Sequence, residues 1–176
     1  MVIKKLLACL FCALIVFSIS MGLYIKVFSR EKQAPFSINV EKDISPRDIL
    51  EAAENGNSDA QYIAGLMYYK EELYSEAAEW YLKAAMQGNI KAQFNLANKY
   101  YEGKGVKQNY KEAFKWYKRA AEQGHSQAQF NLGCMYGRGE GVKKDYAQAN
   151  KWIYKAALQG NIEAQNLLKG VYNFEY

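Results

Sequence analysis

The stretch AQFNLANKYYEGKGVKQNYKEAFKWYKRAAEQG, residues 92–124, recurs 36 residues later as AQFNLGCMYGRGEGVKKDYAQANKWIYKAALQG, residues 128–160. A shorter version begins at Ala60, where KEEL at 70–73 replaces the EGKGVKQN of the second unit. A fixed period of roughly 20 to 50 residues is the signature of stacked repeat architectures. The sequence therefore predicts three consecutive units: 58–89, 90–125 and 126–161.

Within each unit the apolar residues follow the period of an amphipathic helix. Counting from Ala92, Leu96 and Tyr100 stand four and eight residues further on and share one helical face, which is predicted to face the core. The next position along is small, where a partner helix must come close: Gly65, Ala97 and Gly133. One tryptophan in each unit is predicted to fill the space between units: Trp80, Trp116 and Trp152.

The ends of the helices are also marked in the sequence. Ser45 followed by Pro46 and Asp48 predicts a helix start, with Ser45 as the N-cap. Four recurring glycines are predicted to end helices: Gly56, Gly88, Gly124 and Gly160. The sequence therefore predicts a lone helix from Pro46 to Glu54, three helix pairs, and a final unpaired helix from about Ile162 to Tyr172.

This pattern resembles the Sel-one-like repeat, a relative of the tetratricopeptide repeat, whose second helix ends in W-Y-x-K-A-A-x-Q-G. The resemblance covers Ile49 to Tyr172, about seven-tenths of the chain. It implies an all-α fold, a short right-handed α-solenoid of antiparallel helix pairs with a concave side. The departures are local: the first unit lacks the glycine loop, Ala64 replaces an expected Leu, and Ile153 stands where other units have Tyr81 and Tyr117.

The first part of the chain differs from the repeats. After two lysines, Leu6 to Ile25 runs for 20 residues without a charge. At about 1.5 Å per residue this run spans the roughly 30 Å hydrocarbon core of a bilayer. An uncleaved anchor is favoured because a cleavable signal has a shorter apolar run of about 7 to 15 residues. Cleavage after Ser20 is the alternative.

The chain is accordingly divided into a transmembrane anchor or signal at 1–30, a linker at 31–44, and the repeat domain at 45–176. We expect a single-pass membrane protein with its repeat domain in the periplasm, or a secreted or periplasmic protein if the signal is cleaved. Basic residues flank the apolar run on both sides, so the positive-inside rule does not settle the orientation.

Charge and composition exclude several classes of function. The formal net charge is +5, but four basic and no acidic residues lie within 1–30, so the body is nearly neutral. A nucleic-acid partner is therefore not expected, since such binders need a basic face. No cofactor, metal or small-molecule substrate is expected either. The body has a single cysteine, Cys134, and a single histidine, His125, and no metal-ligand spacing.

The concave side is the candidate partner-binding surface. The third and sixth residues after the recurring alanine of each first helix lie opposite the core stripe: Ile63, Leu66, Asn95, Asn98, Asn131 and Cys134. Asparagine amides pair well with an extended peptide backbone, and Tyr62, Phe94 and Phe130 would add apolar contact. The alternative interpretation is that Phe94 and Phe130 pack between units and the asparagines are merely solvated.

A repeat stack offers surface rather than converging reactive groups, so we expect a non-enzymatic module for protein–protein interaction, an adaptor or scaffold. The resemblance also implies an alternative, an immunity protein that binds and neutralises a toxin. An enzyme is the remote alternative. His125 is expected to be a solvent-exposed turn residue and Cys134 a small buried hydrophobe, so neither is a good candidate for catalysis.

Overall fold

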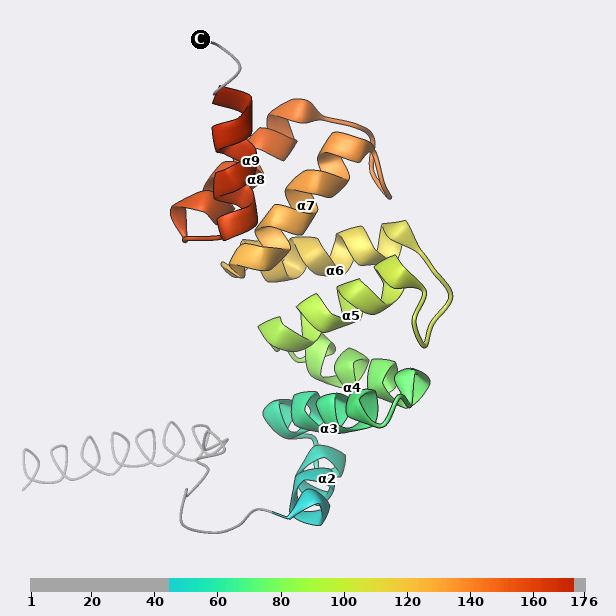
Figure 1. The fold of residues 1–176 in the computed structure, drawn as a ribbon. Coiled ribbons are helices and arrows are strands. Elements are labelled where there is room, and N and C mark those ends of the chain that lie inside the picture. The colour runs from blue at the N-terminus through green and yellow to red at the C-terminus, as the bar shows by residue number, and fades with distance from the viewer. Residues whose placement is uncertain (1–44, 173–176) are drawn as a thin grey trace, which may run out of the picture. The chain divides into compact units, whose positions relative to one another are not determined.

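The computed structural model describes residues 45–172, which form helices and no strand (Figure 1). The helices in chain order are α2 (Pro46–Glu54), α3 (Ser58–Lys70), α4 (Tyr74–Met86), α5 (Ile90–Glu102), α6 (Tyr110–Glu122), α7 (Ser126–Arg138), α8 (Tyr146–Leu158) and α9 (Ile162–Tyr172). Each helix packs against the next one along the chain. The prediction of an all-helical solenoid of paired helices is confirmed, and its right-handed sense stays a prediction.

The predicted membrane segment at 6–25 and the linker at 31–44 lie outside the described residues. Within residues 45–172, none of the helices has the length and apolar character needed to cross a membrane.

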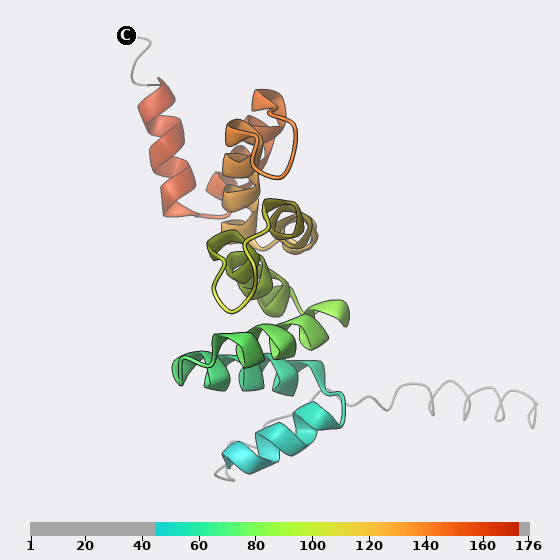
Figure 2. The same ribbon diagram turned by 90° about the vertical axis from the view of Figure 1, so that its right-hand side faces the viewer.

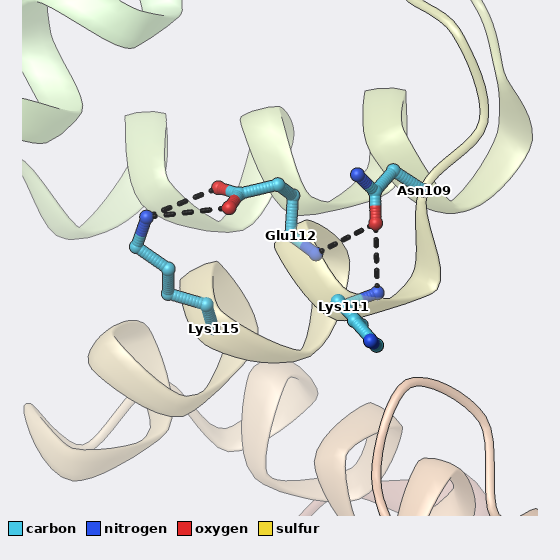
Figure 3. A network of polar contacts seen from close by, with 4 residues as sticks. All are labelled: Asn109, Lys111, Glu112 and Lys115. Atoms are coloured by element: carbon cyan, nitrogen blue, oxygen red, sulfur yellow. Dashed lines mark hydrogen bonds and ion pairs between the residues drawn. The ribbon is translucent and has the colours of Figure 1, made fainter.

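Side-chain caps fix where the helices begin. At α2, the Ser45 hydroxyl accepts the backbone N–H of Asp48, and the Asp48 carboxylate accepts the backbone N–H of Ser45, so the predicted start is confirmed as a capping box. At α6, Asn109 Oδ1 accepts the backbone N–H groups of Lys111 and Glu112 at 3.0 and 3.2 Å, and Glu112 pairs with Lys115 one turn on (Figure 3). The glycines predicted to end helices have φ between 84° and 93°: Gly56, Gly88, Gly124 and Gly160.

The two longer hairpin loops, after α5 and after α7, project from the same edge of the stack (Figures 1 and 2). Gly105 and Gly141 hold equivalent places in these loops, both with positive φ. A Cβ on Gly105 would overlap the carbonyl group of Tyr74, and a Cβ on Gly141 would overlap that of Tyr110. Each loop therefore rests on the start of the second helix of the preceding repeat, which only glycine permits.

Small residues pack against large aromatic and aliphatic residues in the core. A Cβ on Gly65 would lie 2.5 Å from the ring of Tyr81, as expected where two helices of a pair touch. Trp116 and Trp152 are buried, whereas Trp80 is half-buried. The basic side chain three residues further on lies over each tryptophan ring, as with Arg119 at 4.6 Å from the ring centroid of Trp116.

A ladder of glutamine side chains joins one repeat to the next. Gln93 Nε2 donates to the carbonyl of Ala85 in the preceding repeat at 3.1 Å, and Gln123 Nε2 donates to Gln93 Oε1 at 2.7 Å. The same two bonds recur in the neighbouring repeats, with Gln61 and Gln87 in one and Gln129 and Gln159 in the other. Buried polar groups are costly unless paired, so the ladder fixes the spacing of successive repeats.

Candidate functional site

A cavity of about 300 Å³ opens between the first helices of the second and third repeats. The lining residues are Asn98, Tyr101 and Glu102 of α5, Tyr117 of α6, Phe130, Asn131, Cys134, Met135 and Arg138 of α7, and Glu140 in the following loop. The cavity therefore belongs to the junction of two repeats, and neither repeat forms it alone.

Three of the predicted site residues meet at this cavity: Asn98, Asn131 and Cys134. The other three belong to the first and second repeats and do not line it. Asn95 hydrogen-bonds to the tyrosines around it, Ile63 is half-buried, and Leu66 is 38% exposed. A partner-binding role for these six residues stays a prediction.

One asparagine amide at the cavity is held by Tyr117. The Tyr117 hydroxyl donates to Asn98 Oδ1 at 2.5 Å. Burial raises the pKa of Tyr117, and the neighbouring Asn131 amide lowers it. Within the described residues no other hydrogen bond uses Asn98 Nδ2 or Asn131 Oδ1. The cavity thus presents one free amide donor, on the Asn98 side chain that the phenol orients, and one free amide acceptor on the neighbouring Asn131.

A second polar group forms the rim. The Tyr101 hydroxyl donates to Glu140 Oε2 at 3.0 Å and accepts from an Arg138 guanidinium N–H at 3.1 Å. Burial raises the pKa of Tyr101, and the hydrogen bond and charge of Glu140 raise it further, while Arg138 lowers it. Arg138 also lies 3.8 Å from Glu140. The rim is therefore a neutral phenol between two opposite charges.

The third charged group at the cavity, Glu102, is paired with Lys99, which does not line the cavity. Lys99 Nζ lies 3.5 Å from the Glu102 carboxylate, and the same nitrogen lies 4.2 Å from the ring centroid of Tyr69. Lys99 is only 4% exposed, although the equivalent positions of the other two repeats are Met67 and Met135. A buried lysine in this position depends on both contacts.

The two residues considered for catalysis have other roles. Burial raises the pKa of the Cys134 thiol, which disfavours the reactive thiolate. His125 is not the solvent-exposed turn residue expected from the sequence. It is half-buried, its Nδ1 accepts the backbone N–H of Ala128 at 3.2 Å as the N-cap of α7, and its ring stacks on Phe94. Among residues 45–172 no group of three His, Cys, Asp or Glu side chains is placed to hold a metal.

The aromatic residues divide between the two interpretations offered by the sequence. Phe94 packs against Tyr117 and His125, as expected for a residue between repeats. Phe130 packs against the core cluster of α8 and α9 and also lines the cavity, so it fits both interpretations. The asparagines are half-buried, and Asn98 is hydrogen-bonded to Tyr117 rather than merely solvated.

Sequence reasoning did not identify six residues that line this cavity: Tyr101, Glu102, Tyr117, Met135, Arg138 and Glu140. The signal available for Tyr117 was its position beside Trp116, which holds Tyr81 in the first repeat and Ile153 in the third. A tyrosine at a mostly buried position needs a partner for its hydroxyl, and the asparagines of the first helices are candidates. No comparable signal pointed to the rim.

Known proteins share both the repeat and the fold. Sel1 repeats match residues 58–89, 90–125 and 126–161. No curated protein matches the chain. Among solved structures, a Sel1 repeat protein from Oxalobacter formigenes is 36% identical, with a TM-score of 0.65, over 70% of this chain and 96% of that one.

Two further structures are similar. The protein c5321, a protective antigen present in uropathogenic Escherichia coli strains and displaying an SLR fold, is 42% identical with a TM-score of 0.69. The match covers 72% of this chain but 28% of c5321, so the chain spans little more than a quarter of that protein. Cysteine-rich protein B of Helicobacter pylori shares the fold at 23% identity, with a TM-score of 0.52 over 70% of this chain and 97% of that one. By its three repeats and its likeness to the O. formigenes protein, the chain belongs to the Sel1 repeat family.

Proposed function

We propose that this protein is a non-enzymatic binding module that holds an extended segment of another protein between α5 and α7. Sel1 repeats generally serve as scaffolds for protein–protein interaction. The observation that carries the proposal is the presence of two amides at one cavity, of which Asn98 is oriented by Tyr117. An extended residue offers one backbone carbonyl and one N–H, and Asn98 and Asn131 offer a donor and an acceptor for them.

We propose no catalysis because the candidate nucleophile, Cys134, and the candidate base, His125, both have other roles. Cys134 has a raised pKa and His125 uses Nδ1 as a helix cap, so neither is poised to react. The half-buried asparagines and the paired charges of the cavity favour recognition by hydrogen bonds.

Tethering to a membrane belongs to the same proposal. The uncharged run from Leu6 to Ile25 supports a single-pass anchor that holds the repeats in the periplasm. Intact mass of the protein from the membrane fraction is expected to include residue 1 or 2. A mature chain starting at Met21 would contradict the anchor and leave an exported soluble protein.

Site-directed photo-crosslinking in the producing cell tests the binding site. A photoreactive phenylalanine at Phe130, inside the cavity, is expected to capture one protein that mass spectrometry identifies. The same group at Tyr154, which is exposed on α8, serves as the control. Capture of a toxin would make the protein an immunity protein, and capture of an envelope or signalling protein would make it an adaptor.

The purified partner then allows a quantitative test. Asn98→Ala combined with Asn131→Ala is expected to weaken binding about tenfold or more, since two hydrogen bonds of about 0.5 to 1.5 kcal/mol each are lost. The melting temperature is expected to stay nearly unchanged, because the Tyr117 hydroxyl faces the cavity and can bind water. Asn150→Ala with Asn166→Ala removes two exposed amides elsewhere and is the control. Equal affinities in the two double variants would refute the assigned site.

A further inference from the structure

We infer that the cavity between α5 and α7 is a specificity pocket for one uncharged aromatic side chain of the bound segment. This inference rests on the proposed function and adds the chemical class of the residue that is recognised. Three features carry it: the size and walls of the cavity, the pairing of all its charges, and its position beside the two amides.

The size and walls of the cavity match an aromatic ring. An apolar cavity of about 150 Å³ is enough to hold benzene, so about 300 Å³ accepts a large ring with room for a polar tip. Phe130, Cys134 and Met135 line the cavity, and aromatic and sulfur-containing side chains are favourable neighbours of an aromatic ring.

The charges of the cavity argue against a charged occupant. Arg138 lies 3.8 Å from Glu140, and Glu102 lies 3.5 Å from Lys99, so each charged lining residue already has an opposite partner. A cationic or anionic ligand would have to displace one of these partners or leave its own charge unpaired in the cavity. A neutral side chain meets no such penalty. The guanidinium of Arg138 is mostly exposed and is free to lie over an aromatic ring at the entrance.

The position of the cavity links side-chain recognition to backbone recognition. Asn98 and Asn131 line the same cavity and hold the free donor and acceptor. A residue whose backbone pairs with these amides therefore has its side chain at the mouth of the cavity. The backbone contacts accept any sequence, and the cavity selects which residue is placed there.

Cys134 gives direct access to this pocket by disulfide exchange. The full chain with Cys9→Ser and Cys12→Ser retains Cys134 as its only thiol. It is equilibrated with four small disulfides whose caps are 2-phenylethyl, butyl, 2-aminoethyl and 2-carboxyethyl groups, against increasing 2-mercaptoethanol. Exchange is balanced: the Cys134 thiolate displaces one thiol and forms one mixed disulfide. Intact mass gives the modified fraction at equilibrium, which the raised pKa of the thiol does not bias between caps.

Half of the Cys134 modification by the phenylethyl cap is expected to remain at about ten times the 2-mercaptoethanol concentration that halves modification by either charged cap. The corresponding concentration for the butyl cap is expected to be clearly lower than for the phenylethyl cap. The matched control carries Leu66→Cys and Cys134→Ser, which moves the thiol to the same repeat position two units earlier, outside the residues that line the cavity. There the four caps are expected to agree within about twofold.

Three outcomes would overturn the inference: preference for a charged or butyl cap, no preference at Cys134, or no modification of the folded chain by any cap while the unfolded chain reacts. The measurement needs no partner protein. If no aromatic cap is preferred but the asparagine double variant still weakens partner binding, the aromatic pocket is refuted and the peptide-binding site stands. If the aromatic cap is preferred but the double variant binds the partner normally, the peptide-binding site is refuted and the aromatic pocket stands.

Discussion

The junction between the first and second repeats and the junction between the second and third contain the same pair of tyrosines but differ in the side chains around it. In the first, Tyr69 and Tyr74 lie 5.3 Å apart between ring centroids, and in the second, Tyr101 and Tyr110 lie 5.2 Å apart. A glycine loop rests on the second member of each pair. The recurring residues therefore build the same tyrosine pair and the same loop contact at both junctions.

The variable residues then give the two junctions opposite character. At the first, Lys104 Nζ lies 3.9 Å from the ring centroid of Tyr74, and buried Lys99 contacts Tyr69. At the second, Glu140 replaces Lys104 and Met135 replaces Lys99, and the 300 Å³ cavity lies there. A few side chains at equivalent positions therefore decide which junction is filled by lysine side chains and which one contains a cavity that can bind a ligand.

The largest expected effect comes from α6, the second helix of the middle repeat. Helix α6 packs on α5 and on α7, and Trp116 is its largest buried residue. Trp116→Ala is expected to lower the free energy of unfolding by about 3 to 5 kcal/mol, because it leaves a cavity. Its Nε1 has no hydrogen-bond partner within the described residues, so the loss is one of packing. Thermal unfolding followed by circular dichroism measures this effect.

Trp80→Ala is the matched comparison, because Trp80 holds the same repeat position but is only half-buried. A smaller loss is expected there. A shift of one or two degrees in the melting temperature of Trp116→Ala would contradict its role in the core.

Exchange of the buried residues sharpens the difference between the junctions. Met135→Lys would bury a cation whose neighbour three residues on is Arg138 rather than an acid, and about 3 kcal/mol or more of stability is expected to be lost. The opposite change, Lys99→Met, restores the residue of the other two repeats and is expected to cost less than about 1.5 kcal/mol. Urea unfolding of both variants gives the two values. Equal losses would mean that the charge pattern of the junctions does not matter.

A smaller effect on partner affinity is expected when the asparagine amides are kept but the hydroxyl beside them is removed. Tyr117→Phe keeps Asn98 and Asn131 but removes the hydroxyl that orients Asn98, and partner affinity is expected to fall about three- to tenfold. Tyr81→Phe is the control, because it removes the equivalent hydroxyl at the first junction at a similar cost in stability. Titration calorimetry with the purified partner should find its affinity unchanged. Loss of affinity in both variants would indicate general loosening of the stack.

The smallest expected effect is a dependence on pH that only the third repeat carries. Burial lowers the pKa of His125 below the usual histidine value of about 6.5, and the charge of Lys91 lowers it further. The unfolded chain therefore takes up the proton more readily than the folded one. The stability that the neutral cap contributes is present above about pH 6.5 and is lost as the pH falls through the lower folded value.

A loss of up to about 1 kcal/mol is expected between pH 7.5 and 5.5, the contribution of one cap. His125→Asn gives the third repeat the cap that Asn89 gives the second, and it is expected to remove this dependence. Melting curves of both chains across that range test it. An unchanged slope in the variant would assign the titration to another group.

Sequence reasoning was successful where a single residue determines the backbone. Ser45 and the helix-ending glycines act locally, so the starts and ends of helices were readable. The cap at His125 was missed, although Asn57, Asn89 and Asn161 hold the same repeat position and act as caps. Comparison across the repeats would have identified it.

The cavity depends on geometry that one repeat does not contain. That Asn98 and Asn131 line one cavity follows from the rotation between successive repeats, which spacing along the chain does not give. Two of the predicted site residues, Asn95 and Asn131, share a repeat position. In the structure Asn95 is bonded to the tyrosines of the earlier junction instead.

The glutamine ladder allows whole repeats to be gained or lost by duplication or deletion within the gene. A tandem duplication of 36 codons that starts anywhere in the later repeats copies both glutamines of one rung, the alanine carbonyl they need and one complete helix pair. The new unit joins its neighbours through bonds that already exist, and Ser45 and α9 still close the two ends. Unequal recombination can therefore lengthen or shorten the protein by whole units without a compensating substitution, so a lineage can acquire new binding junctions before any of them is selected.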